Sequence, residues 1–97
     1  ESYIMDVNST LEQRGNRYGT FENNARLTQA LMDVVDELGQ NDLSPVHREM
    51  VHMTFHKIAR MCCGDQWYED NPHDIAGYAK LLEDHIKEVM YDEEQFS

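Results

Sequence analysis

Apolar residues recur at intervals of three and four along most of this chain, in four separate segments. Such intervals place side chains on one face of an α-helix, whereas a half-buried strand would alternate with period two. No segment alternates in that way over a useful length. The pattern predicts helices over about 5–13, 20–38, 44–63 and 71–91, and therefore an all-α protein.

Capping and helix-breaking residues mark the ends of these segments. An N-cap side chain accepts a hydrogen bond from the first turn, proline suits the first helical position, and glycine suits the end of a helix. The first segment ends in the double-glycine turn at 14–19. The later helices have predicted starts at Thr20, at Ser44 with Pro45, and at Asn71 with Pro72, and predicted stops at Gly39 and Gly64.

The apolar rows predict how the helices pack into a compact four-helix domain spanning residues 1–97, with an acidic tail at 92–97. The third and fourth helices are expected to form the central antiparallel pair. Tyr18 and Phe21 are expected to fill the core near the first reversal, and stacking on a base is the alternative role. A second copy could complete so small a core, and the methionine-rich third helix would suit a homodimer interface. The predicted core residues are Leu27, Leu31, Val34, Val35 and Leu38, then Val51, Phe55, Ile58 and Cys62, then Ile75, Ala79, Leu82, Ile86 and Val89.

Charge narrows the range of partners. The chain has 19 acidic and 8 basic residues and a formal net charge of −11. Nucleic acids and anionic membranes attract clustered Lys and Arg, so direct binding to either is not expected. An acidic surface suits divalent cations, a basic patch on another protein, or simple solubility. The adjacent Cys62 and Cys63 and the lack of a membrane-length apolar run favour a protein of the reducing cytoplasm.

One side of the third helix carries polar groups that could perform chemistry. Glu49, His52, His56, Arg60 and Cys63 fall together at 100° per residue, opposite the apolar row. Histidines four residues apart can share a metal ion, although the glutamate of an HExxH motif is absent here. A solvated polar face is the alternative interpretation.

Carboxylates gather around the start of the fourth helix, at Asp65, Glu69, Asp70 and Asp74. Oxygen ligands of this kind suit Mg²⁺. A solvated acidic loop is the alternative, and Asp74 could also serve as a favourable charge near the helix N-terminus. Lys57, at the margin of the apolar face, could pair with a fourth-helix carboxylate or meet a substrate phosphate. The sequence has no nucleophile elbow, P-loop or dinucleotide fingerprint.

Several short motifs together suggest a family. Arg14-Gly15-x-Arg17-Tyr18-Gly19-x-Phe21, Leu43-Ser44-Pro45, His56-Lys57-Ile58-Ala59-Arg60, Gly64-Asp65 and Asp74-Ile75-Ala76-Gly77-Tyr78-Ala79-x-Leu81 follow in that order. Over about residues 9–83 the chain resembles a family of small helical phage and prophage proteins of unknown function. That family is distantly similar to the all-α, MazG-like nucleoside triphosphate pyrophosphohydrolases.

The resemblance implies an Mg²⁺ site that serves a nucleotide. Glu49 and Asp74 match the first glutamate and the last aspartate of the pyrophosphohydrolase pattern, while His52 and Asn71 stand where it has other carboxylates. The resemblance implies Glu49, Asp70 and Asp74 as metal ligands, His52 or His56 as a further ligand or proton acceptor, and Lys57 and Arg60 as cations that neutralise phosphate.

Two functional hypotheses follow, both placed in the cytoplasm of a bacterial host. The first is a metal-dependent, nucleotide-binding or pyrophosphohydrolase-like site. The second is a non-enzymatic, acidic phage accessory protein that binds and inhibits a basic host protein, either a defence protein or one that binds nucleic acid. Convergence of the carboxylates on a pocket would favour the first, and dispersal over an outer face the second.

Overall fold

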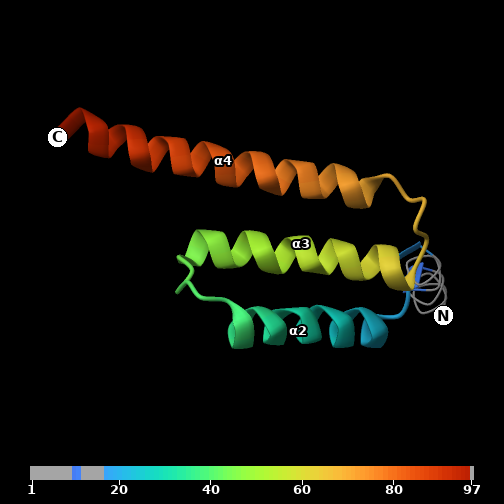
Figure 1. Ribbon diagram of the computed structural model, residues 1–97. Helices are drawn as coiled ribbons and strands as arrows, with labels where there is room; N and C mark the ends of the chain where they lie inside the picture. The colour runs from blue at the N-terminus through green and yellow to red at the C-terminus, as the bar shows by residue number, and fades with distance from the viewer. Residues whose placement is uncertain (1–9, 12–16, 97) are drawn as a thin grey trace, which may run out of the picture.

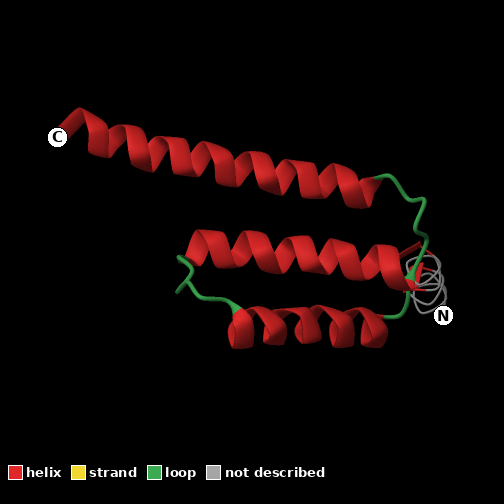
Figure 2. Cartoon of the chain, in the orientation of Figure 1, coloured by secondary structure: helices red, strands yellow, loops and turns green. Residues whose placement is uncertain are grey.

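The computed structural model describes residues 10–11 and 17–96, with side chains up to residue 91. Its helices are α2 (Phe21–Leu38), α3 (Pro45–Cys63) and α4 (Asp70–Phe96). In Figure 1, α3 lies between α2 and α4, and α3 is in contact with both. The described residues contain no strand (Figure 2), which confirms the all-α class.

The arrangement corrects one prediction and leaves another open. The centre of the layer is α3 alone, rather than a pair made by α3 and α4, because α3 packs on a neighbour along each of two sides. The helix predicted over 5–13 lies outside the described residues except for Thr10 and Leu11, which are helical. A fourth helix therefore stays a prediction.

The predicted caps of α2 and α3 are confirmed. The Thr20 hydroxyl accepts a hydrogen bond from the Asn23 N–H, and the Ser44 hydroxyl accepts one from the His47 N–H, both at 3.2 Å. The Gly39 N–H donates to the carbonyl of Val35 at 2.8 Å where α2 ends. These ends could be predicted because each depends on atoms only three or four residues apart.

Both ends of α4 differ from the prediction. The helix begins at Asp70, so Asn71 lies inside the first turn rather than at the cap, and its side chain is fully buried. The helix also continues to Phe96 instead of ending near residue 91. At 27 residues against the 19 of α3, α4 is about 40 Å long and α3 about 28 Å, and α4 projects beyond the other helices (Figure 1).

The Ser44 cap gives a small, measurable contribution to stability. Replacing Ser44 by alanine removes the acceptor for the His47 N–H and is expected to lower the free energy of unfolding by about 1 kcal/mol. Ser44→Asp is the matched control, because aspartate also caps well and should keep most of the stability. Urea unfolding of both variants checks this, and equal losses would contradict a capping role.

The helices bury few apolar side chains. Among the described residues, the buried hydrophobic ones are Met32 and Ala59. The stripe of α2 that is buried is Asn24, Thr28 and Met32, so the predicted row of leucines and valines lies beside the contact with α3 rather than in it. Val34 is 52 % exposed and Leu38 is exposed as well, which corrects both core predictions.

The rest of the predicted core is also only partly covered. Phe21 is 88 % exposed and Cys62 is exposed, which corrects both predictions. Ile86 and Val89 on α4 are exposed too, and so is Ala79. The reason is geometric, because a single layer of helices covers only the edges along which they touch. The Cα radius of gyration is 17.5 Å, against about 13 Å for a compact domain of 100 residues.

Within the described residues, no helix combines the length and the apolarity that a bilayer crossing requires.

Candidate functional site

The segment Arg17–Gly19 is seated directly on the end of α3. The Asp65 N–H donates to the carbonyl of Arg17 at 2.8 Å, which ties this segment to the residue after Gly64. Gly19 has φ +81°, in the left-handed region that favours glycine. A Cβ on Gly64 would lie 2.5 Å from the Arg17 oxygen and 2.6 Å from the Gly19 nitrogen. Two glycines therefore allow two backbone segments to touch.

This contact assembles a stack of arginines and tyrosines. The Arg60 guanidinium lies 4.3 Å from the centroid of the Tyr18 ring, and the Arg17 guanidinium lies 4.6 Å from that of Tyr68. The two tyrosine rings are 5.7 Å apart and tilted by 46°. Hydrogen bonding to Asp70 and to Tyr18 raises the pKa of Tyr68 to about 12, so its phenol stays protonated at neutral pH. We call Arg17, Tyr18, Arg60 and Tyr68 the arginine–tyrosine cluster.

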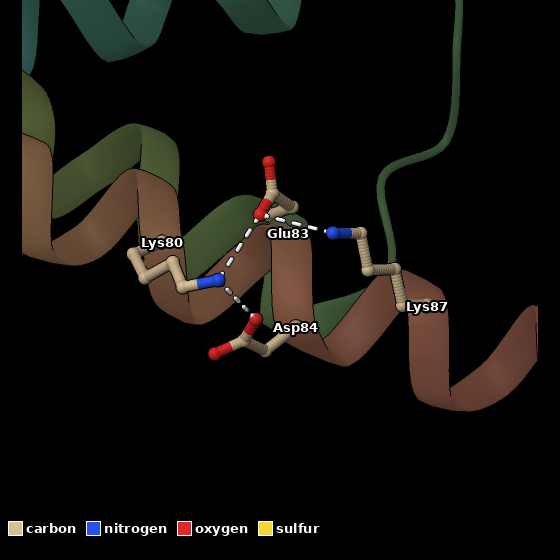
Figure 3. Close-up of polar contacts among 4 residues, drawn as sticks. All are labelled: Lys80, Glu83, Asp84 and Lys87. Carbon is tan, nitrogen blue, oxygen red and sulfur yellow. Dashed lines mark hydrogen bonds and ion pairs between the residues drawn. The ribbon is translucent and has the colours of Figure 1, made fainter.

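The cluster differs from the other cations of the described residues. Arg26 pairs with Glu22 and Arg48 with Asp36. On α4, Lys80 reaches Glu83 at 3.2 Å and Asp84 at 2.9 Å, and Lys87 reaches the same oxygen of Glu83 at 3.3 Å (Figure 3). These pairs are exposed and contribute little stability. Arg17 and Arg60 have no carboxylate within 4 Å in the part of the chain that the structure describes; they lie on aromatic rings instead.

Lys57 and Asp74 form an ion pair between α3 and α4. The Nζ of Lys57 lies 2.8 Å from a carboxylate oxygen of Asp74, and the lysine side chain is only 11 % exposed against 37 % for the aspartate. The hydrogen bond from Lys57 holds the pKa of Asp74 below its ordinary value of 3.8. Of the two outcomes that the sequence left open for Lys57, the structure has the pairing with a fourth-helix carboxylate.

His56 lies on the same side of α3 as Arg60. Burial is the main cause that lowers its pKa, and the positive charges of Arg60 and Lys57 lower it further. His52 also acts on it electrostatically, so these two histidines are neighbours as their spacing predicted. A neutral imidazole at neutral pH can accept a proton but does not add positive charge for a phosphate.

Buried polar atoms without a partner among the described residues lie in the first half of α2 and on the first turn of α4. The side-chain amide of Asn71, fully buried, has no hydrogen bond to the described residues on either its nitrogen or its oxygen. The amide of Asn24 donates to the Tyr18 carbonyl at 2.6 Å, but its oxygen and the Thr28 hydroxyl have no partner in this part of the chain. Buried polar groups normally bond to protein, water or a ligand. These atoms can therefore accept or donate further hydrogen bonds.

The predicted metal ligands do not form one group. Asp74 is paired with Lys57, and Asp70 begins α4. Glu49 lies eight residues before Lys57, about 12 Å away along the axis of α3. In the described parts of the chain, no three His, Cys, Asp or Glu side chains come together to hold a metal ion. The residues described do not fit a metal cage made by this chain.

Glu49 and His52 instead line an open groove of about 390 Å³ between α2 and α3. The Arg48–Asp36 pair lies in the same groove, so a cation already neutralises part of its acidic lining. The complete lining is Gln29, Met32, Asp33, Asp36, Pro45, Arg48, Glu49 and His52.

Of the four members of the cluster, sequence reasoning placed only Arg60 among the predicted site residues. Arg17 and Tyr68 were not predicted, and Tyr18 was expected mainly to fill the core. The signal available was the pairing of a double-glycine turn at one end with Gly64-Asp65 at the other, since glycine often marks close backbone approach.

Comparisons with models of known protein families, with curated proteins and with solved structures found no match.

Proposed function

We propose that this chain binds a nucleotide at the arginine–tyrosine cluster. The observation that carries the proposal is that Arg17 and Arg60, in a chain of net charge −11, lie on tyrosine rings and have no carboxylate partner among the described residues. A guanidinium can hold a phosphate through two parallel hydrogen bonds. A tyrosine ring offers a surface for a base to stack on. Phosphate and base together define a nucleotide.

A neighbouring group supports the same ligand. His56 is held neutral and can accept a proton on the same side of α3 as Arg60. The resemblance to pyrophosphohydrolases also implies hydrolysis with Mg²⁺ on Glu49, Asp70 and Asp74, which the positions of these carboxylates do not support. Nucleotide binding has the stronger support, because these three carboxylates are dispersed rather than grouped.

The same resemblance places the protein in a phage and its action in the cytoplasm of the bacterial host. We also propose that a fourth helix spans residues 5–13 and that the chain pairs with a second copy.

Titration with a panel of deoxynucleoside triphosphates, with and without Mg²⁺, tests nucleotide binding. Trp67, the one tryptophan of the chain, is 85 % exposed beside Tyr68 and supplies the fluorescence signal. Arg60→Gln should weaken binding about tenfold or more, since it removes a charge-assisted hydrogen bond donor. Arg48→Gln is the matched control, because it removes the same charge from the same helix at the groove and should change binding less than about twofold.

The outcomes separate the parts of the proposal. Binding that Arg60→Gln weakens and Arg48→Gln spares supports the site, and pyrophosphate release from the same samples would add the hydrolytic reaction. Equal weakening by both variants would indicate a general charge effect and contradict the site. Absence of binding across the panel would contradict the proposed function.

The alternative, an acidic accessory protein, is favoured by the dispersal of carboxylates over outer surfaces. Asp33 and Glu37 on α2 and Glu88 on α4 are exposed, and none of these three has a cation partner among the described residues. Such a surface would attract a basic host protein in a salt-dependent manner. Capture of a host protein at low salt that is lost at high salt, with no nucleotide binding, would favour this alternative.

A further inference from the structure

The three described helices form a layer one helix thick, and its two broad faces differ. Because α3 touches α2 along one side and α4 along the opposite side, its remaining positions point to one face or the other (Figure 2). Lys57 marks the direction of α4 through Asp74, and Arg48 marks that of α2 through Asp36. These two directions are opposite, and the line through them divides the positions of α3 into two sets. At 100° per residue, Val51 and Ile58 lie on one side of this line, and Glu49, His56 and Arg60 lie on the other.

The neighbouring helices continue both faces. Both α2 and α4 run antiparallel to α3 (Figure 1). Viewed along α3, successive residues of α2 and α4 therefore rotate in the opposite sense to those of α3. When the buried residues of α2 and α4 are placed toward α3, the apolar rows of both helices lie on the same side as Val51 and Ile58. We call this surface the apolar face. It comprises Leu27, Leu31, Val34 and Leu38 of α2, Val51 and Ile58 of α3, and Ile75, Leu82, Ile86 and Met90 of α4.

An independent observation agrees with this assignment. The groove between α2 and α3 is lined by Gln29, Asp33 and Asp36 from α2 and by Glu49 and His52 from α3. All five belong to the opposite, polar face by the same angular count. The polar face thus carries the groove and Arg60, and the apolar face remains without a function in the described part of the chain.

The surface area indicates how much is left uncovered. The accessible surface of the chain is 7674 Å², whereas a folded monomer of 11.4 kDa has about 5,800 Å² by the usual scaling with mass. The excess of about 1,900 Å² falls within the share that each partner of an obligate homodimer buries, about 1,000–2,500 Å². The excess belongs to the whole chain, and the apolar face contributes to it through the exposed Val34, Leu38, Ile86 and Met90.

The net charge of the chain bears on whether a second copy can cover the apolar face. A second copy also has a net charge of −11, so two such chains associate best through surfaces poor in carboxylates. By the same angular count, no Asp, Glu, Lys or Arg of α2 or α3 lies on the apolar face, and Glu83 borders it on α4 beside Met90. Pairing through it keeps the acidic side chains of both copies in water, on the outside.

We propose that two copies of this chain pack apolar face against apolar face, related by a twofold axis. Each copy presents the same surface, as an isologous interface requires. The exposed Ile86 and Met90 lie on α4, whose C-terminal part projects beyond the start of α3 (Figure 1). The arginine–tyrosine cluster and the groove stay accessible, because Arg60 and the groove lie on the other face. The choice of this face for the pairing rests on the packing of the helices and not on nucleotide binding.

The mass of the full chain in solution is the first test. Light scattering coupled to size exclusion should give twice 11.4 kDa at micromolar concentration, and the melting temperature should rise with protein concentration. A mass of 11.4 kDa over the whole range of protein concentration, with a constant melting temperature, would overturn the proposal. The same result would be expected if another part of the same chain covered the apolar face. A larger, open-ended assembly would overturn a closed pair.

Paired substitutions on α2 locate the interface. Val34→Glu places a carboxylate on the apolar face, while Gln29→Glu adds the same charge on the polar face; both positions are exposed in the single chain. Val34→Glu should weaken self-association at least a hundredfold and Gln29→Glu less than threefold. Equal effects of the two variants would overturn the assignment of the face. Leu38→Glu, nearer the end of α2, gives the same readout if Val34→Glu does not fold, and a wild-type-like mass for Leu38→Glu would then count against the proposal.

Discussion

Replacing Gly64 by alanine is expected to lower the free energy of unfolding by about 3 kcal/mol or more, a large effect for one methyl group. The new Cβ would lie 2.5 Å from the carbonyl oxygen of Arg17 and 2.6 Å from the nitrogen of Gly19, and it would also meet the carbonyl carbon of Tyr18. All three are backbone atoms, so no side-chain rotation can relieve the overlap. Gly64 itself has φ −124°, so close approach rather than backbone strain explains the cost.

Gly77 provides the matched control. It lies inside α4, and a Cβ there would meet no atom within 4 Å. Gly77→Ala should stabilise the protein by about 0.5–1 kcal/mol, since alanine is the better helix former. Urea unfolding of both variants at one protein concentration checks the pair of predictions. Similar effects of the two substitutions, together with an unchanged near-ultraviolet signal of the tyrosines, would show that the contact at Gly64 is not tight.

The Gly64 variant also links the fold to the proposed site. If the helices stay folded while the segment Arg17–Gly19 detaches from α3, the cost in global stability will be small. The near-ultraviolet signal of the tyrosines would then change, because the ring of Tyr18 would leave Arg60 and Tyr68. Nucleotide binding should be lost in that case even though the helical content is retained. The far- and near-ultraviolet dichroism of one sample distinguishes local detachment from global destabilisation.

The caps of α2 and α3 could be predicted from sequence because their physics is local. Thr20 and Ser44 each accept a hydrogen bond from an N–H three residues away, and no tertiary contact is needed. The pairing of Lys57 with a fourth-helix carboxylate was one of two predicted outcomes, since a cation at the margin of an apolar face is usually paired.

The core could be predicted only in part, because periodicity identifies an apolar row without saying what covers it. Val34 and Leu38 belong to a regular row on α2, yet Asn24 and Thr28 occupy the contact with α3. An apolar row that pairs with a second copy has the same spacing as a row that fills the core of one chain. The sequence therefore does not distinguish an interface from a core. The distinction needs the position of α3 relative to α2, which depends on tertiary packing.

The predicted site residues and the arginine–tyrosine cluster share only Arg60. Arg60 was among the predicted residues because of its place on the polar side of α3. Arg17 and Tyr68 lie far apart in sequence and meet only because Gly19 and Gly64 let two backbone segments touch. Glu49 and Asp74 were matched through a resemblance, and spacing along the chain does not determine distances between helices.

The second large effect is expected at the ion pair between α3 and α4. Asp74→Asn should lower the melting temperature more than Lys57→Met does. Without the Asp74 carboxylate, the Lys57 ammonium, 11 % exposed, would remain largely buried without a counter-charge, which is the costly way to break such a pair. Methionine at position 57 instead fills a similar volume, and it leaves a carboxylate that is 37 % exposed and that water can solvate.

The pH dependence gives an independent check on the same pair. Lys57 holds the folded-state pKa of Asp74 below its ordinary value of 3.8, so the ion pair stabilises the protein fully at pH values above 3.8 and loses this contribution as the pH falls through the lower, folded-state pKa. A protonated Asp74 resembles asparagine, so the melting temperatures of wild type and Asp74→Asn should converge in acid. At neutral pH they should differ most. A constant difference between pH 7 and pH 3, or a greater loss in Lys57→Met than in Asp74→Asn, would show that the pair does not stabilise the contact between α3 and α4 in this way.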